Sequence, residues 1–237
     1  MKLEARKEHI LDIIIRDFIR TASPVSSGRI SERLSKKPDL AGSPATIRNI
    51  MLGLDDEGYL YQPHTSAGRA PTDKGYRYFV DNLMSVREPA HEIRMELDKI
   101  IEKMEWKMDS AFSELSRTLA GHLGLFSGVG VLNEERIFGH GLSEVLKEPE
   151  FGEHDMAVRF ADFIENIHSD IKKFSDTEVD AKGFGVVSVV FRDNDLGECV
   201  IFSAGPQRMN YEKATSVIRY AAEDIKSNKK KNARRKR

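Results

Sequence analysis

Cysteine is nearly absent from this chain, since Cys199 is the only one among 237 residues. A single cysteine excludes an intramolecular disulfide and a cysteine-built zinc site. The sequence also has no apolar run of about 18 residues, which argues against a transmembrane helix. Its charged N-terminus, MKLEARKEHI, lacks the apolar segment of a signal peptide. We therefore expect a soluble, cytoplasmic protein with no membrane partner, no metal site and no cofactor.

Sequence patterns of catalytic sites are missing as well. The segment SGVG at 127–130 lacks the glycine spacing and the Lys-Ser/Thr pair of a phosphate-binding loop. Neither Gly-x-Ser-x-Gly nor His-Glu-x-x-His occurs. We expect no catalytic residues and no enzyme activity.

Positive and negative charges almost cancel over the whole chain, but they are distributed unevenly along it. Residues 1–88 hold 14 Lys/Arg and 12 Asp/Glu, a net charge of +2. Residues 89–225 hold 15 and 26, a net charge of −11, and residues 226–237 hold 8 and none, a net charge of +8. The total is −1. Any affinity for nucleic acid must therefore come from a local arrangement of charge.

Helix signals dominate the first part of the chain. Isoleucines at helical spacing predict a first helix over residues 4–19. The Ser-Pro pair at 23–24 should end it, because a residue before proline disfavours the helical conformation. A second helix is expected over residues 26–36. A third begins after Ser43, a good N-cap followed by proline, and runs to about Glu57, just before Gly58. Three short helices in this order indicate a helix-turn-helix unit.

The third helix has an outer face suited to DNA. Its inward stripe is formed by Ile47, Ile50, Met51 and Leu54. This stripe leaves Thr46, Arg48 and Asn49 outside, near Ser43 at the N-terminal end. Arg can pair with guanine and Asn with adenine, while Thr suits a phosphate or a thymine methyl. We take these four residues as candidate DNA contacts; the alternative is an ordinary solvated helix face.

A short strand at 59–62, a polar turn at 63–68 and a return at 69–71 follow the third helix and predict a wing. The three helices and this wing together predict a winged-helix DNA-binding domain over residues 1–88. At the wing tip, His64, Thr65, Ser66 and Arg69 are candidate phosphate or minor-groove contacts, although an ordinary turn would carry similar residues. Ser26 and Arg29, at the start of the second helix, could meet a phosphate or simply cap that helix.

Residues 89–122 predict one long connecting helix. Apolar side chains recur along it every three or four residues, and such a stripe needs a partner. That partner is the C-terminal domain of the same chain, the same helix of a second subunit, or both at once. For the second case the candidate dimerisation residues are Ile93, Leu97, Ile100, Met104 and Met108.

Residues 123–225 mix both element types. A helix is expected over 156–175, paired strands over 185–192 and 198–204, and a last helix over 211–226. The basic tail, residues 226–237, has almost no apolar side chains and is expected to be disordered. The fold class is therefore α+β, with a small sensor or scaffold domain after the winged helix.

Several motifs resemble the heat-inducible transcription repressor family HrcA. The most specific is QPHTSAGR at 62–69, supported by SPATIRN at 43–49, GLSEVLKEPEF at 141–151 and GPQRMNY at 205–211. The chain departs from the family pattern at Ala70, usually Ile, and at Asn210, usually Asp. It is also about a hundred residues shorter than is usual. The resemblance identifies residues 123–225 as a reduced GAF-like domain, in which Arg208 and Tyr211 are expected to hold the fold.

The resemblance implies a homodimeric repressor of heat-shock (chaperone) genes that binds an inverted-repeat operator (CIRCE) in double-stranded DNA. It also implies that the chaperonin keeps the repressor active. An alternative is a winged-helix regulator whose C-terminal domain senses a small molecule. A further alternative is a structural protein whose winged helix binds protein instead of DNA.

Overall fold

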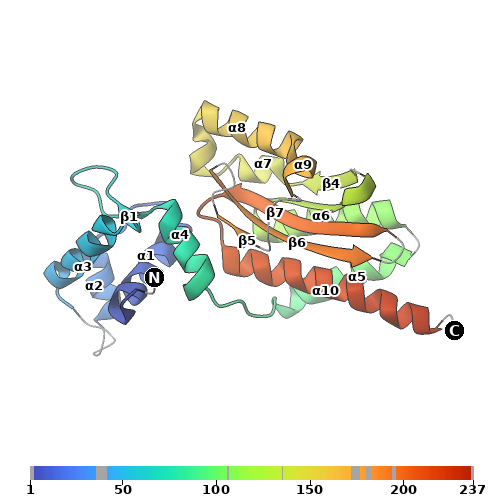
Figure 1. The fold of residues 1–237 in the computed structure, drawn as a ribbon, viewed down its shortest axis with the longest axis horizontal. Helices are drawn as coiled ribbons and strands as arrows, with labels where there is room; N and C mark the ends of the chain where they lie inside the picture. The colour runs from blue at the N-terminus through green and yellow to red at the C-terminus, as the bar shows by residue number, and fades with distance from the viewer. Residues whose placement is uncertain are drawn as a thin grey trace. The chain divides into compact units, whose positions relative to one another are not determined.

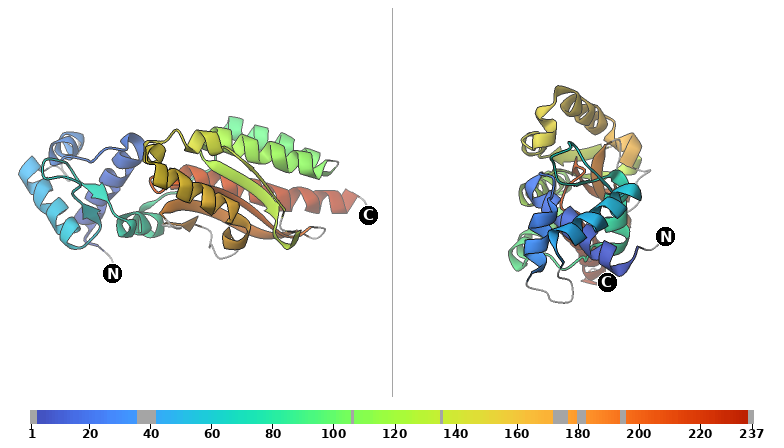
Figure 2. Two further views of the ribbon diagram at one scale, coloured as in Figure 1. Left: turned by 90° about the horizontal axis from the view of Figure 1, so that it is seen from above. Right: turned by 90° about the vertical axis from the view of Figure 1, so that its left-hand side faces the viewer.

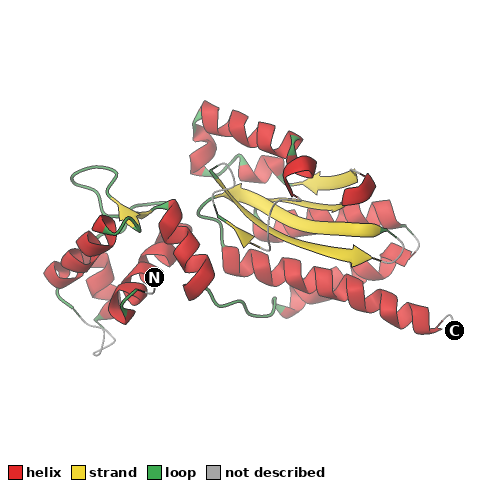
Figure 3. Cartoon of the chain, in the orientation of Figure 1, coloured by secondary structure: helices red, strands yellow, loops and turns green. Residues whose placement is uncertain are grey.

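The computed structural model describes residues 3–35, 42–105, 107–134, 136–171, 177–179, 183–193 and 196–235. The chain divides into two compact units, Met1–Met84 and Ser85–Arg237 (Figure 1). Helices and strands occur in both, so the expectation of a mixed fold is confirmed (Figure 3).

The first unit contains three helices, a two-stranded antiparallel sheet and a final helix. In chain order its elements are α1 (Ala5–Thr21), α2 (Ser27–Leu34), α3 (Pro44–Asp56), β1 (Leu60–Tyr61), β2 (Ala70–Pro71) and α4 (Asp73–Tyr78), which continues as a π-helical turn over Phe79–Leu83. Three of the helices start at a hydroxyl cap. The side chains of Ser26, Ser43 and Thr72 accept hydrogen bonds from the backbone N–H groups of Arg29, Thr46 and Gly75.

The core of this unit lies where α1 crosses α3. Ile14, Ile47, Leu54 and Phe79 are fully buried. In α3 the expected inward stripe holds for three of its four members, whereas Ile50 is only half-buried. The stripe therefore fixes which side of α3 faces solvent.

A buried carboxylate joins α1 to α2. The side chain of Asp17 is only 3% exposed, and its oxygens lie 2.6, 2.8 and 3.4 Å from guanidinium nitrogens of Arg20, Arg29 and Arg33. Burial of a carboxylate is costly unless it is paired, and three arginines supply that pairing. This cluster connects the end of α1 to α2 through Arg29 and Arg33.

The second unit is a five-stranded antiparallel sheet with helices on both faces. The elements before the sheet's long strands are α5 (His91–Glu102), a 3₁₀ turn (Lys103–Glu105), α6 (Met108–Leu123), β3 (Phe126–Val131), a 3₁₀ turn (Leu132–Glu134), β4 (Arg136–His140), α7 (Leu142–Val145), a 3₁₀ turn (Pro149–Gly152), α8 (His154–Glu165) and α9 (Ile167–Asp170). The remainder are β5 (Thr177–Glu178), β6 (Phe184–Asp193), β7 (Gly197–Pro206) and α10 (Tyr211–Arg235). The strand order is β4-β3-β7-β6-β5.

Residues 89–122 form a helical hairpin, which corrects the prediction of one long helix. His122 Nε2 of α6 lies 2.8 Å from Glu96 of α5, and Lys103 Nζ lies 2.8 Å from Glu114. These pairs show that α5 and α6 run antiparallel. Folding back lets the apolar stripe pack on α6 and α10 of the same chain.

The candidate dimerisation residues consequently pack inside the second unit. Leu97, Ile100 and Met104 are at most 6% exposed, and Ile93 and Met108 are half-buried. The chain's own C-terminal domain is therefore one partner of this stripe, and a contact with a second subunit stays a prediction.

The two faces of the sheet are covered by different helices (Figure 2). Because side chains alternate along a strand, β3 and β7 send Phe126 and Phe202 to one face and Ser127 and Ser203 to the other. The phenylalanine face meets α7 and α8, and the opposite face meets α6 and α10. The hydroxyls of Ser127 and Ser203 lie 2.7 Å apart and satisfy each other.

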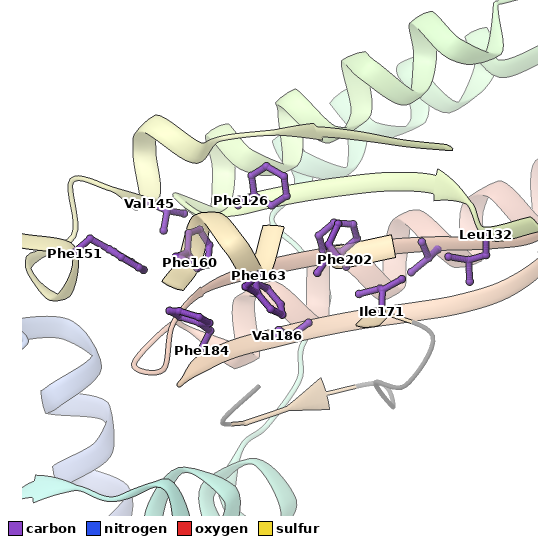
Figure 4. Close-up of a cluster of buried hydrophobic side chains, with 13 residues drawn as sticks. Phe126, Leu132, Val145, Phe151, Phe160, Phe163, Ile171, Phe184, Val186 and Phe202 are labelled. Carbon is purple, nitrogen blue, oxygen red and sulfur yellow. The ribbon is translucent and has the colours of Figure 1, made fainter. Parts of the chain in front are cut away.

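Phenylalanines fill the space between the sheet and α8 (Figure 4). Phe160 lies 5.0 Å from Phe151 and 4.9 Å from Phe184 between ring centroids, and Phe163 lies 5.5 Å from Phe184. Such contacts stabilise beyond the apolar area that they bury. The expected helix 156–175 is divided in the structure into α8, which ends at Glu165, and α9, which covers Ile167–Asp170; residues 172–175 lie outside the described part.

The last helix is longer than predicted. α10 continues to Arg235, and Lys226 Nζ lies over the ring of Phe191 at 5.5 Å from its centroid. The helical backbone through Arg235 corrects the prediction that the tail is disordered from residue 226; residues 236–237 lie outside the described part.

An arginine clamp joins the segments 148–150 and 205–211. The Arg208 side chain is 12% exposed and pairs with Glu148 and Glu150, its Nη2 lying 3.1 Å from Oε2 of Glu150. Tyr211 is fully buried and donates its hydroxyl hydrogen to the carbonyl oxygen of Gln207 at 2.8 Å. Both contacts are structural, in line with the expectation for these two residues.

Arg208→Ala should lower the free energy of unfolding by about 2–3 kcal/mol, because it leaves two partly buried carboxylates without their partner. Arg208→Lys should lose less. Lys147→Ala is the control, since the ion pair of Lys147 with Glu144 is exposed and contributes little. Urea unfolding measures the difference, and equal stabilities of the Arg208→Ala and Lys147→Ala variants would contradict the clamp.

A second polar contact fastens β4 to α6. His140 Nδ1 lies 2.8 Å from the hydroxyl of Ser116, and its Nε2 lies 3.4 Å from Arg117. Burial, followed by the charge of Arg117, lowers the pKa of His140 below its ordinary value. Because the folded pKa is the lower one, the unfolded chain takes up the proton first.

Stability from His140 is therefore present above the unfolded pKa of about 6.5 and is lost as the pH falls through that value. Unfolding free energies measured from about pH 7.5 down to about pH 5 should fall less steeply for His140→Gln than for the natural chain. His154→Gln, which removes an exposed histidine of the same unit, is the control. An unchanged slope in His140→Gln would refute the role of this imidazole.

Candidate nucleic-acid interface

A groove of about 430 Å³ runs along α3 in the first unit. Its walls are α3, the loop between β1 and β2, and the start of α2. Its lining residues are Ser26, Ser27, Arg48, Met51, Leu52, Gln62, Thr65, Ser66, Ala67, Gly68 and Arg69. The groove combines hydroxyl, amide and guanidinium groups with three apolar side chains, Met51, Leu52 and Ala67, an arrangement that fits a polar, extended ligand.

The first turns of α3 present the expected polar face. Ser43, Thr46, Arg48 and Asn49 are all exposed. The Ser43 hydroxyl accepts from the Thr46 N–H at 3.1 Å and lies 3.0 Å from the Thr46 hydroxyl. These two side chains are therefore partly engaged in starting the helix, whereas no contact to another side chain holds Arg48 or Asn49 among the described residues.

The β1–β2 loop is held in one shape by Gln62. Its Nε2 donates to the carbonyl oxygens of Thr65 and Ala67 at 3.0 and 2.9 Å. The Ala67 N–H also donates to the carbonyl oxygen of His64 at 2.8 Å, which closes a turn. His64, Thr65 and Ser66 remain exposed at the tip, as expected for residues that contact a ligand.

The root of this loop is fixed by backbone contact. Val25 and Arg69 exchange two N–H···O=C bonds of 2.9 Å, which adds a third short segment beside the β1–β2 pair. A Cβ atom at Gly68 would overlap the carbonyl oxygen of Val25. Only glycine allows this approach, so Gly68 brings the loop against the start of α2.

Arg69 differs from its expected role. Its Nε lies 2.8 Å from Oδ2 of Asp55 in α3, and its side chain is only 11% exposed. The guanidinium therefore ties the loop to α3 rather than extending from the tip. We treat Arg69 as a positioning residue, and a direct DNA contact of its side chain stays a prediction.

The two candidate DNA contacts at the start of α2, Ser26 and Arg29, have different surroundings. Ser26 caps the helix and lines the groove. Arg29 points to the Asp17 cluster, with its Nε 2.8 Å from Oδ2 of Asp17, and does not line the groove. Its side chain is 42% exposed, so it adds positive charge to the surface while serving the junction between α1 and α2.

The groove thus brings together five of the ten candidate DNA contacts: Ser26, Arg48, Thr65, Ser66 and Arg69. The other five, Ser43, Thr46, Asn49, His64 and Arg29, lie outside its lining. Gln62 and Leu52 also line the groove, but the sequence did not point to them as candidates. The helical spacing of Leu52 from Arg48 could have indicated it, whereas the role of Gln62 depends on the turn that it closes.

No cluster of His, Cys, Asp and Glu that could hold a metal ion occurs among the described residues. None of the helices over these residues is long and apolar enough to cross a membrane.

Curated proteins similar to this chain carry the name heat-inducible transcription repressor HrcA. The protein of Alkaliphilus metalliredigens is 57% identical over 88 residues, which is 37% of this chain and 24% of that protein. The proteins of Chlorobium phaeobacteroides and Desulforudis audaxviator are 42% and 41% identical over 125 and 147 residues. The resemblance predicted from the motifs is confirmed. No family model matches the chain.

These matches are partial, because the chain spans 24–40% of the length of the three relatives. Among solved structures, a crystal structure described as that of a hypothetical protein covers 95% of this chain and 99% of its own, with a TM-score of 0.69 and 18% identity. That likeness concerns the fold alone.

Gly68→Ala should destabilise the first unit by about 1–3 kcal/mol, because the added methyl group displaces the loop from Val25. Gly28→Ala is the matched control. Gly28 lies within α2, and the nearest atom to its Cβ would be 4.0 Å away, so this change should leave stability unchanged or raise it. Thermal unfolding of the two variants tests the contact, and equal melting temperatures would show that the loop root adjusts freely.

Proposed function

We propose that this chain is a sequence-specific transcriptional repressor that binds double-stranded DNA through a winged helix-turn-helix in its first unit. The observation that carries the proposal is the exposed Arg48–Asn49 face of α3 beside the groove. In this assignment α3 is the recognition helix and the β1–β2 loop is the wing. The similarity to HrcA repressors supports the same reading.

The geometry of α3 is suited to the major groove. A helix enters that groove with the residues of its N-terminal part against the base edges. In α3 these residues are Thr46, Arg48 and Asn49, and the buried stripe leaves them accessible. Arg48 and Asn49 offer the bidentate pairings with guanine and adenine, and Thr46 suits a phosphate or a methyl group.

The wing supplies contacts that position the protein. Thr65, Ser66 and His64 at its tip, together with Ser26 at the start of α2, present hydrogen-bond donors to phosphate oxygens. Gln62, Gly68 and Arg69 hold the wing in place, so that these donors need not be ordered on binding. A rigid wing lowers the entropy cost of association.

We assign the second unit as a reduced GAF-like domain. Its order β4-β3-β7-β6-β5, with helices on both faces, supports this assignment. The rival function, sensing of a small molecule, would need a cavity in such a domain. The space between sheet and α8 is instead occupied by packed phenylalanines, which favours a scaffold over a sensor.

Binding of an inverted repeat requires two copies of the domain related by a twofold axis, so we propose a homodimer with half-site centres about 10–10.5 bp, or a multiple, apart. The relatives' name, heat-inducible transcription repressor, supports heat-responsive genes as targets. From the resemblance of the motifs we propose that these are heat-shock (chaperone) genes, that the protein acts in the cytoplasm and that the chaperonin is its regulatory partner.

Asn49→Ala and Arg48→Ala should each weaken binding to an inverted-repeat operator by about 1–3 kcal/mol, with a much smaller effect on scrambled DNA. The loss is selective because a base contact exists only on the correct sequence. Fluorescence anisotropy at several salt concentrations provides the measurement.

Arg77→Ala is the control for these variants. It removes one exposed positive charge from α4 of the same unit and should weaken both duplexes equally. If Arg48→Ala and Asn49→Ala behave like Arg77→Ala, neither residue reads a base. If the natural chain does not prefer the operator over scrambled DNA, the proposed function itself is wrong.

A further inference from the structure

We propose that Leu52 is a sequence-reading residue that contacts the C5-methyl group of a thymine in each operator half-site. This inference rests on the proposed function and adds an apolar contact to it. It would make the repressor sensitive to a single methyl group on the DNA.

The placement of Leu52 differs from that of the other apolar residues in α3. Its side chain is 42% exposed, whereas Met51 and Leu54 on either side are at most 4% exposed. It lies four residues after Arg48 and three after Asn49, so all three occupy one face of the helix. An isolated exposed leucine requires no explanation. One on the recognition face, inside the groove, is available to DNA.

The chemistry of the major groove restricts what an apolar side chain can meet there. Its base edges present hydrogen-bond donors and acceptors, and the thymine C5-methyl is the apolar group among them. Leu52 has no donor for a phosphate. The donors at the rim, Ser26, Arg48 and Thr65, serve the backbone and the polar edges.

The position of the thymine follows from helix geometry. Four residues along α3 correspond to about 6 Å of axial rise. Base pairs repeat every 3.4 Å or so along the duplex. The thymine contacted by Leu52 should therefore lie within about two base pairs of the base contacted by Arg48.

The test uses the full chain and the inverted repeat that it selects from a random duplex pool. Each thymine of a half-site is replaced in turn by deoxyuridine, which removes the methyl group and keeps the base pairing. For the natural chain, one replacement near the Arg48 base should weaken binding about four-fold, the factor expected for one buried methyl group. Leu52→Ala should bind the natural operator more weakly and be indifferent to that replacement.

Two variants serve as controls. Leu52→Met keeps an apolar side chain and should retain part of the uracil penalty. Leu146→Ala truncates a leucine of nearly equal exposure, 41%, in the second unit and should leave the whole pattern unchanged. Thermal unfolding verifies that Leu52→Ala remains folded.

Three outcomes would overturn the inference: no thymine replacement weakens the natural chain, Leu52→Ala keeps the full penalty, or Leu52→Ala weakens operator and scrambled DNA equally. The proposed function survives each of them as long as the natural chain prefers its operator. Loss of that preference would instead refute the proposed function.

Discussion

The approach of Gly68 to the backbone of Val25 is the constraint on which the first unit depends. It joins the β1–β2 loop to the start of α2, while Arg69 and Asp55 join the same loop to α3. The groove exists because these two attachments hold three segments around one space. A larger residue at 68 would open that space, and the polar side chains at its rim would lose their common orientation.

The second unit depends on apolar packing instead. Its sheet lies between the phenylalanine cluster and the helices α6 and α10. Because α5 folds back on α6 and α10, the apolar side chains of α5 are covered instead of exposed. Arg208 then links the segment around Glu148 to the start of α10. In the described part of this unit, both faces of the sheet are therefore covered by packed side chains.

Local signals predicted the first unit well. Capping residues and the Ile47–Leu54 stripe located α3, and turn residues located the loop. The sequence could not show that Arg69 turns inward, because its partner Asp55 is chosen by the loop's path. The hairpin of α5 and α6 was missed for a similar reason. Helical periodicity continues through the break, and the long-range pairs Glu96–His122 and Lys103–Glu114 distinguish a hairpin from a single helix. The candidate DNA contacts themselves stay predictions.

The internal bonds of Gln62 have a consequence for how this protein can change. The loop's shape is set by the Gln62 side chain, by backbone carbonyls of the tip and by the glycine at its root. The side chains of His64, Thr65 and Ser66 are therefore not what holds the loop. Substitutions there alter the chemistry of the tip without altering its position. A lineage could therefore exchange its tip residues one at a time while the fold stays intact, and an engineer could do the same.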